Sequence, residues 1–269
     1  MHITISKPFA VSERGGRLNN EDSVYPLPER VNADQRLFMV CDGVGGAEKG
    51  EVASALACES MHTYFDTFLP PETDPDASFI CKAVQYTEAC FDTYVKEHPE
   101  ATGMATTLTM AYLTSVGITL AHIGDSRIYY LRDGEILCQT EDHSLVNNLV
   151  KLGQLTPEEA RVHPRRKVIT RAIQGSIYAT EPDIMVWKDV QAGDFLFLCT
   201  DGVLEVVSDE MIANLFRRGT GLSEIKNAIM EACEGKSRDN YSFYIVQVQK
   251  VQASMNLRQN ILSFLHTFL

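Results

Sequence analysis

The chain has 269 residues, of which 45% are hydrophobic, and carries a formal net charge of -12. A chain of this length can bury one large core or two small ones, and no Ser/Gly/Pro-rich linker divides it, so we expect one domain. The acidic balance, with an isoelectric point of about 5.0, argues against a general binder of nucleic acid or of an anionic membrane.

No apolar run in the sequence approaches the length of a membrane span, and residues 1–5 lack the basic start and apolar core of a signal peptide. The seven cysteines include no C-x-x-C pair, which favours small buried side chains in a reducing compartment. We therefore expect a soluble, cytoplasmic protein.

The first hundred residues predict two strands followed by two helices. Residues 2–11 alternate loosely, as in a strand, and residues 36–41 form a continuous apolar run that is typical of a buried strand. Apolar side chains at helical spacing predict one helix from about Gly50 to Phe68 and a second over residues 77–96. Residues 70–76, which are rich in proline and acid, predict a surface loop between them.

The remainder of the chain predicts mostly strands, with short helices between them. The strands are expected over residues 106–114, 117–123, 127–132, 135–139, 183–188, 194–200 and 242–250. Helices are expected over residues 143–152, 156–162 and 222–234, with another from Ser208. This order suits antiparallel sheets flanked by helices, an α+β layered domain, and not a regular βαβ wind.

Residues 253–269 place their apolar side chains on one helical face. A terminal helix docked on its own domain is the favoured interpretation, and a helix that binds a partner or a second copy is the alternative.

Short acidic signatures recur along the whole chain, and three of them directly follow an apolar run. They are Glu21-Asp22, Asp42-Gly43, Gly124-Asp125, Asp201-Gly202 and Asp239-Asn240. Because a turn must follow each buried strand, carboxylates from distant segments are presented at strand ends, where a fold can bring them together. Gathered carboxylates repel one another unless cations neutralise them, so the pattern predicts a cluster of hard divalent ions.

The residue types favour Mg²⁺ or Mn²⁺, because the donors are carboxylates and backbone carbonyls and there is no His/Cys set for zinc. Two such ions about 3.5–4 Å apart can activate a water and stabilise an in-line phosphoryl displacement. Asp42-Gly43-Val44-Gly45-Gly46 suits the bridging position, since its glycines let the backbone approach an ion. Each signature alone would also fit an ordinary turn or a solvated face, so their number in one chain is what favours the metal site.

These residues resemble the motifs of the metal-dependent serine/threonine protein phosphatases of type 2C, in family order and from about residue 4 to residue 249. The details are similar to the bacterial branch. The resemblance rests on Arg17-x-x-Asn20-Glu21-Asp22, Asp42-Gly43-Val44-Gly45-Gly46 with Gly50, Ala53 and Ser54, Thr106-Thr107, Gly124-Asp125-Ser126-Arg127-x-Tyr129, Asp142-His143-Ser144-Leu145-Val146, His163-Pro164-Arg165 with Val168-Ile169-Thr170-Arg171, Thr200-Asp201-Gly202 and Asp239-Asn240.

The resemblance implies an α+β fold: a central antiparallel β-sandwich flanked by helices on both faces, with the metal cluster at one end. Residues 1–250 would form the catalytic domain and residues 251–269 a C-terminal helical tail. The stretch from about 145 to 171 is similar to the family's flap, a mobile segment that affects substrate choice and product release.

The resemblance also implies the ligands of two ions, Mg²⁺ or Mn²⁺. Asp42 would bridge both ions, and the carbonyl of Gly43 would bind the second. Asp201 and Asp239 would complete the shell of the first ion.

Further roles follow from the same resemblance. Glu21 and Asp22 would hold metal-bound waters, and Arg17 would bind the substrate phosphate. Asp125, together with Asp201, would support a third and weaker metal site.

Some positions depart from the family pattern. Ala105 replaces a glycine before the threonine pair, for which we expect mild repacking, and Val44 replaces a histidine of many eukaryotic members. Ser237-Arg238 replaces a glycine-rich lead into Asp239-Asn240. His143 and His163 are candidates for acid/base groups, but packing and hydrogen bonding within the flap is the favoured interpretation.

The sequence thus predicts a phosphoprotein phosphatase in which a metal-activated hydroxide attacks phosphoserine or phosphothreonine directly. Its partner would be a phosphoprotein, for example a serine/threonine kinase or a signalling regulator, and we expect a monomer. A catalytically silent family member that acts as a binding module is one alternative. A hydrolase of nucleotides or other small phosphates is another.

Overall fold

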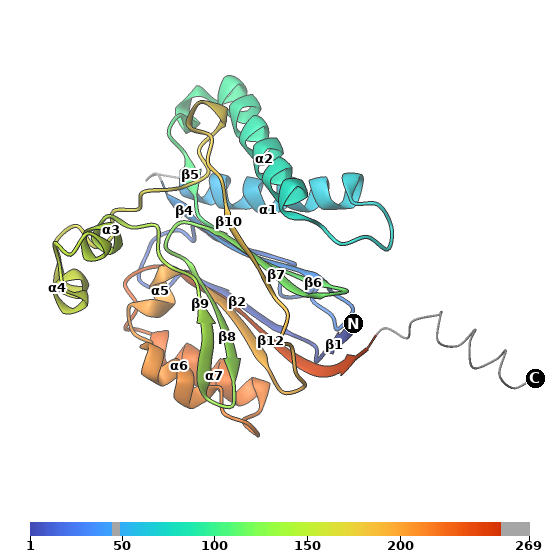
Figure 1. The fold of residues 1–269 in the computed structure, drawn as a ribbon. Coiled ribbons are helices and arrows are strands. Elements are labelled where there is room, and N and C mark those ends of the chain that lie inside the picture. The colour runs from blue at the N-terminus through green and yellow to red at the C-terminus, as the bar shows by residue number, and fades with distance from the viewer. Residues whose placement is uncertain (45–48, 254–269) are drawn as a thin grey trace, which may run out of the picture.

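Two six-stranded antiparallel sheets pack face to face in the computed structural model, which describes residues 1–44 and 49–253 (Figure 1). Helices cover both outer faces, so the α+β sandwich expected from the resemblance is confirmed. The expected C-terminal helix lies outside the described residues, apart from a few residues at its start. None of the described helices is long and apolar enough to cross a membrane.

The first sheet combines the two ends of the chain with its middle. Its order is β1-β12-β11-β8-β9, and β2 also pairs with β12. The bounds are β1 (His2–Ile5), β2 (Phe9–Glu13), β8 (Arg127–Arg132), β9 (Glu135–Gln139), β11 (Phe195–Cys199) and β12 (Tyr241–Gln252).

The second sheet carries the strand that ends at Asp42 and Gly43. Its order is β10-β7-β6-β4-β3, and β5 also pairs with β4. The bounds are β3 (Asp22–Tyr25), β4 (Leu37–Val44), β5 (Ala105–Thr106), β6 (Leu108–Thr114), β7 (Gly117–Ile123) and β10 (Asp183–Trp187).

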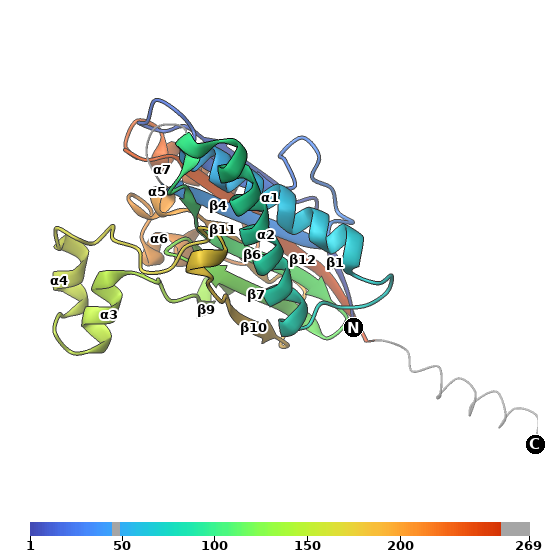
Figure 2. The ribbon, with the colours of Figure 1, turned by 90° about the horizontal axis from the view of Figure 1, so that it is seen from above.

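Long helices α1 (Lys49–Phe68) and α2 (Ala77–Glu97) cover the second sheet, as both views show (Figures 1 and 2). Short helices α5 (Asp201–Leu204), α6 (Asp209–Leu215) and α7 (Leu222–Cys233) cover the first sheet. The 3₁₀ turns η1 (Pro99–Ala101) and η2 (Ser176–Tyr178) lie in connecting segments.

The layered packing explains why the strands are apolar without interruption. Along β4, Met39 packs toward α1 and α2. Its neighbours Phe38 and Val40 pack between the two sheets. Phe197 and Phe243 on the first sheet pack against α6 and α7 in the same way. A strand that is buried on both faces has no polar side, so its sequence shows a run and not an alternation.

The flap, residues 145–171, projects from one end of the sandwich with its helices α3 (Leu145–Lys151) and α4 (Pro157–Val162) (Figures 1 and 2). An isolated bridge between Ser144 and Ile169 closes its base, and a second bridge between Thr106 and Ile173 ties the segment that follows it to β5. Thr156 Oγ1 accepts from the Glu159 N–H, and the Thr156 N–H donates in return to the Glu159 carboxylate, which fixes the start of α4.

The structure differs from the expected elements in several places. The expected strand over residues 106–114 is interrupted at Thr107, between β5 and β6. The opening strand is split into β1 and β2. Residues 22–25 form strand β3, which was not expected because its acidic and polar residues give no apolar pattern. Asp201 and Gly202 do not form a simple turn after β11 but begin the helical turn α5.

Candidate metal centre

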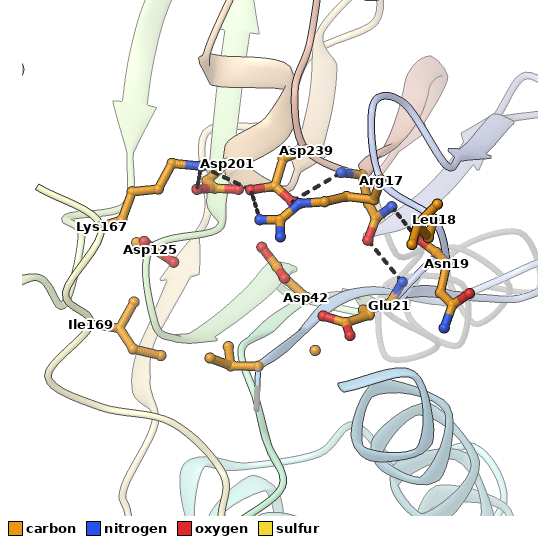
Figure 3. A pocket seen from close by; sticks show the side chains of 13 residues that line it. Arg17, Leu18, Asn19, Glu21, Asp42, Asp125, Lys167, Ile169, Asp201 and Asp239 are labelled. Carbon is orange, nitrogen blue, oxygen red and sulfur yellow. Dashed lines mark hydrogen bonds and ion pairs between the residues drawn. The ribbon is translucent and has the colours of Figure 1, made fainter. Parts of the chain in front are cut away.

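The acidic signatures meet in one cavity of about 550 Å³ at the end of the sandwich where β4 and β11 end (Figure 3). Six separate segments of the chain contribute to its walls. The lining residues are Arg17, Leu18, Asn19, Glu21, Asp42, Gly43, Val44, Asp125, Lys167, Ile169, Asp201, Asp239 and Asn240. Of the residues predicted for the site, only Asp22 is missing from this lining.

Asp42 is held by its backbone, which leaves its carboxylate free for the cavity. The backbone N–H of Asp42 donates to Thr107 Oγ1 at 2.9 Å. The carbonyl of Asp42 accepts from Thr106 Oγ1 at 2.9 Å and from the Thr107 N–H at 2.9 Å. The threonine pair therefore fixes the residue that was predicted to bridge two ions.

Gly43 lies where no side chain fits. A Cβ on Gly43 would lie 2.0 Å from the carbonyl oxygen of Gly50 and 2.6 Å from that of Glu21. The N–H of Gly43 donates to the Glu21 carbonyl at 3.0 Å. Glycine is thus required by the close approach of α1 and of the segment before β3, and it leaves the Gly43 carbonyl at the cavity wall.

Asp201 reaches the cavity from the first turn of α5, directly after β11. The next residue, Gly202, touches the Asp239 loop so closely that a Cβ would lie 1.8 Å from the Asn240 carbonyl oxygen. Ser237 Oγ also donates to the Gly202 carbonyl at 2.9 Å. These contacts bring Asp201 and Asp239 to the same wall.

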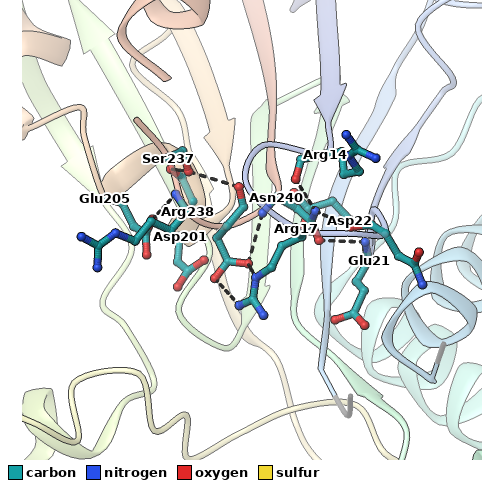
Figure 4. Close-up of polar contacts among 12 residues, drawn as sticks. Arg14, Arg17, Glu21, Asp22, Asp201, Glu205, Ser237, Arg238 and Asn240 are labelled. Carbon is teal, nitrogen blue, oxygen red and sulfur yellow. Dashed lines mark hydrogen bonds and ion pairs between the residues drawn. The ribbon is translucent and has the colours of Figure 1, made fainter. Parts of the chain in front are cut away.

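Asn240 joins the segment that carries Arg17 to the loop that carries Asp239 (Figure 4). Its side-chain amide donates to the carbonyls of Arg14 and Asn19, both at 2.7 Å. Its side-chain oxygen accepts from the Glu21 N–H at 2.9 Å. One buried amide therefore positions both sides of the cavity mouth.

Arg17 grips Asp239 with two parallel hydrogen bonds. Arg17 Nε donates to Asp239 Oδ1 and Arg17 Nη2 donates to Asp239 Oδ2, both at 2.8 Å (Figure 3). This bidentate geometry is the one by which arginine binds carboxylates and phosphates. The Arg17 side chain is 55% exposed, so it can exchange this carboxylate for another anion.

Lys167 is a cavity residue that sequence reasoning missed. It comes from the flap, and its Nζ lies 2.8 Å from Asp239 Oδ2, 2.7 Å from Glu205 Oε1 and 3.5 Å from Asp201 Oδ2 (Figure 3). Glu205, which follows α5, was missed as well. Neither residue carries a local signal, since a lysine among arginines in a polar loop is typical of a solvated surface.

Asp22 lies behind the cavity wall and is 6% exposed. It pairs with Asp42 across strands β3 and β4. Its Oδ2 accepts from Thr200 Oγ1 at 3.0 Å, which connects it to the residue before Asp201. Asp125 does line the cavity, in the turn between β7 and β8.

The carboxylates of the cavity strongly disfavour one another's charge. Burial and the nearby Asp201 and Asp239 raise the pKa of Asp22 to about 7. Burial and the Asp201 carboxylate raise the pKa of Asp125 to about 7. Burial and the Asp22 carboxylate raise the pKa of Asp42 well above its usual range.

Asp239 is the exception in this group. Burial acts to raise its pKa, but the hydrogen bonds from Arg17 and Lys167 outweigh it, so the pKa of Asp239 lies below its usual value. The pKa of Lys167 is in turn raised, because its acidic neighbours, Asp201 first, outweigh the effect of burial.

The donor set fits a pair of hard divalent cations. The side chains of Asp42, Asp201, Asp239 and Glu21 offer oxygens only, with the Gly43 carbonyl beside them. Asp42 and Asp125 have raised pKa values because they are buried near other carboxylates, and bound cations would relieve this repulsion.

A dependence of stability on pH follows from these raised values. A carboxyl whose pKa is raised in the folded state binds more protons there than in the unfolded chain, so its contribution to stability is lost as pH rises from about 4 to 7. Divalent ions require the ionised form. We expect the increase in Tm caused by Mn²⁺ to grow between about pH 5 and pH 8, measured by scanning calorimetry with and without Mn²⁺. An equal increase at all pH values would contradict this.

A second group of side chains that could hold a metal ion consists of His122, His143 and Asp183. Within the described ranges, it is the only such group whose ligand atoms all lie within 4.8 Å of one another. Its ligand atoms are already bonded. His143 Nδ1 accepts from the Gly124 N–H at 3.1 Å and its Nε2 lies 3.1 Å from Asp183. His122 Nε2 lies 2.8 Å from a backbone carbonyl, and Arg171 donates to Asp183 at 2.7 Å. This group therefore serves hydrogen bonding at the base of the flap, as favoured for His143.

Comparison with known proteins agrees with this geometry. The family model described as protein phosphatase 2C matches residues 12–239. The serine/threonine protein phosphatase PstP of Mycobacterium tuberculosis is 37% identical over 251 residues. That match covers 91% of this chain but 46% of PstP, so the chain spans about half the length of that relative.

A further relative and a solved catalytic domain are matched over most of their own length. A putative protein phosphatase 2C-type protein of Streptococcus pyogenes is 32% identical, and the match covers 77% of this chain and 82% of that protein. The crystal structure of the catalytic domain of PstP, in complex with two manganese ions, superposes with a TM-score of 0.77 at 35% identity, covering 92% of this chain and all of that one. The gathered carboxylates, the sandwich that holds them and these matches together show that the chain belongs to the protein phosphatase 2C family.

Proposed function

We propose that this chain is a metal-dependent protein phosphatase that hydrolyses phosphoserine and phosphothreonine. The observation that carries the proposal is the cavity, in which five carboxylates that line the same space lie beside an arginine with the geometry to bind phosphate. Family membership and the two manganese ions of the PstP catalytic domain support the same reaction.

In this proposal Asp42 would bind both ions, Mg²⁺ or Mn²⁺, and the Gly43 carbonyl would bind the second ion. Asp201 and Asp239 would complete the shell of the first ion. Such ions would supply a nucleophile from water at neutral pH and neutralise the charge of the phosphoryl oxygens. The protein's part is to fix these ligands, which the Thr106–Thr107 pair does for Asp42.

Arg17 is proposed to bind the substrate phosphate. Its bidentate bond to Asp239 shows that the guanidinium is oriented toward the cavity and can grip two oxygens at once. Once Asp239 binds a metal ion, the Arg17 guanidinium is available for the phosphate, for which its fork geometry is well suited.

Three further carboxylates are proposed to support the centre. Glu21, in the cavity wall, would hold metal-bound water, and Asp22, which lies opposite Asp42 on strand β3, would act in the same role. Asp125 would share a third and weaker ion with Asp201. None of the described residues that line the cavity is a cysteine. Cys41, next to Asp42, is fully buried in the core under α1, so direct attack by water is favoured over a cysteine nucleophile.

A groove beside the cavity favours a protein substrate over a nucleotide or other small phosphate. It has a volume of about 1270 Å³, runs between the flap and helices α5 and α6, and shares Asp125, Lys167 and Asp201 with the cavity. A small phosphate would leave this groove empty, whereas the chain that flanks a phosphoserine would occupy it. The proposal also includes the substrate, which would be a phosphoprotein such as a serine/threonine kinase or a signalling regulator. It further includes a monomeric enzyme and a cytoplasmic location.

The test is hydrolysis with and without Mn²⁺ of a phosphothreonine peptide, of ATP and of an aryl phosphate. We expect turnover of the peptide and of the aryl phosphate only with Mn²⁺, and a kcat/KM for the peptide that exceeds that for ATP at least tenfold. A preference for ATP would favour a small-molecule hydrolase. Absence of turnover with Mn²⁺ bound would favour the silent binding module.

A further inference from the structure

Lys167 is the flap's only described ionic link to the carboxylates of the metal centre. Its ammonium lies between Asp239 and Asp201, the two residues proposed to complete the shell of the first ion, at 2.8 and 3.5 Å (Figure 3). The side chains of Asp239 and Asp201 are 17% and 23% exposed. The ammonium group of Lys167, which comes from the projecting flap, thus lies among the largely buried carboxylates of Asp239 and Asp201.

We propose that Lys167 is a counter-ion built into the flap, which neutralises Asp201 and Asp239 when no divalent ion is bound and which such an ion must displace. The proposal rests on the proposed metal-dependent function. It adds that metal binding and the position of the flap are coupled through this one side chain.

Competition follows from the positions of the charges. Lys167 Nζ binds the same oxygen, Asp239 Oδ2, that Arg17 Nη2 binds. A divalent ion held by Asp239 and Asp201 would stand within a few ångströms of the ammonium, where like charges repel strongly in a partly buried site. The lysine must therefore withdraw as the ion enters.

Glu205 provides a place for the displaced ammonium. Its Oε1 lies 2.7 Å from Lys167 Nζ, on the side of α5 that faces the groove and not the cavity. Glu205 Oε2 also accepts from the Arg238 N–H at 3.0 Å, which keeps the carboxylate in place. Lys167 can therefore break its ion pairs with Asp239 and Asp201 and retain the ion pair with Glu205.

The coupling is reciprocal: if a bound ion weakens the ion pairs of Lys167, then those ion pairs lower the affinity for the ion by the same factor. The chain offers a matched control in Lys151, a second lysine of the flap. Lys151 pairs with Glu141 at 2.5 Å and does not line the cavity. Lys151→Gln makes the same change of charge as Lys167→Gln without touching the metal centre.

Calorimetric titration of the metal-free protein with Mn²⁺ tests the competition. We expect Lys167→Gln to bind Mn²⁺ about 5–150-fold more tightly than the wild type, the usual range of coupling between two sites, and Lys151→Gln to bind like the wild type. Equal affinities for all three proteins would overturn the proposal, as would equal tightening in both variants, which would show a general effect of charge.

Hydrogen exchange of residues 163–169, measured by mass spectrometry, tests the coupling to the flap. In the wild type Mn²⁺ should increase exchange in this segment. In Lys167→Gln exchange should already be high and should not respond to Mn²⁺. Exchange in the wild type that is unchanged or slowed by Mn²⁺ would overturn the coupling. A wild type that binds no Mn²⁺ would instead overturn the proposed function, so the two failures are distinguishable.

Discussion

Replacement of Asp42 by asparagine is expected to lower Mn²⁺-dependent turnover by about 10³-fold or more, because several kcal/mol of transition-state stabilisation depend on the ions it is proposed to bridge. The fold should survive the change. The hydrogen bonds that hold residue 42 use its backbone and the hydroxyls of Thr106 and Thr107, none of which is altered. Phosphopeptide turnover at saturating Mn²⁺ measures the loss.

The same variant should raise the Tm of the metal-free protein. The Asp42 carboxylate is buried beside Asp22 and Asp201, which raises its pKa, and asparagine removes that charge at nearly constant volume. The increase in Tm on adding Mn²⁺ should disappear, since ligand binding stabilises only a protein that binds the ligand. Asp66→Asn, the same change on the exposed face of α1, is the control. Normal turnover, or a lower Tm in EDTA, would contradict the assignment of Asp42.

Replacement of Arg132 by methionine is expected to destabilise the fold by about 3–5 kcal/mol while leaving the affinity for Mn²⁺ unchanged. Arg132 binds Asp194 with two hydrogen bonds of 2.7 and 2.9 Å. Asp194 is 0% exposed and is otherwise bonded to the Tyr130 hydroxyl and, at 2.7 Å, to the Gln191 N–H. Loss of the guanidinium leaves a buried carboxylate without a counter-charge.

For a chain of this size the expected loss corresponds to a fall in Tm of roughly 6–20 °C, which thermal unfolding would detect. Lys151→Met is the control, because its ion pair joins two side chains that are 52% and 68% exposed. Pairs of that kind contribute about 0–1 kcal/mol. A similar small effect in both variants would show that the Arg132–Asp194 pair is not a structural anchor.

The sequence predicted best where neighbouring residues alone decide the structure. Strands 117–123, 127–132 and 135–139 have the predicted bounds. Asp133 and Gly134 form the turn between the last two, with φ of 50° and 81°, a conformation that an Asp-Gly pair adopts readily. Strand β3 was missed, because it has only four residues, two of them polar, and it depends on pairing with β4 and on packing of Val24 between the sheets.

The metal centre was predicted in part for the same reason. Carboxylates such as Asp42 and Asp201 stand next to strong apolar runs, so their place at strand ends could be inferred. Asp22 also lies opposite a predicted site residue, Asp42, in the β3–β4 pair, yet it is buried and its Oδ2 accepts from Thr200 Oγ1 at 3.0 Å. That Asp22 lies opposite Asp42 depends on the register of β3 against β4, and that register is a property of the folded sheet.

By itself the sequence determined that acidic residues end buried strands, that they are oxygen donors suited to Mg²⁺ or Mn²⁺, and that the chain carries the motifs of its family. Only the tertiary structure decided that Arg17 pairs with Asp239 and that Lys167 lies among these acids, because 222 and 72 residues separate the two basic residues from Asp239. Electrostatic interactions act through space, so no local pattern could show that a lysine of the flap neutralises the residues proposed to bind the first ion.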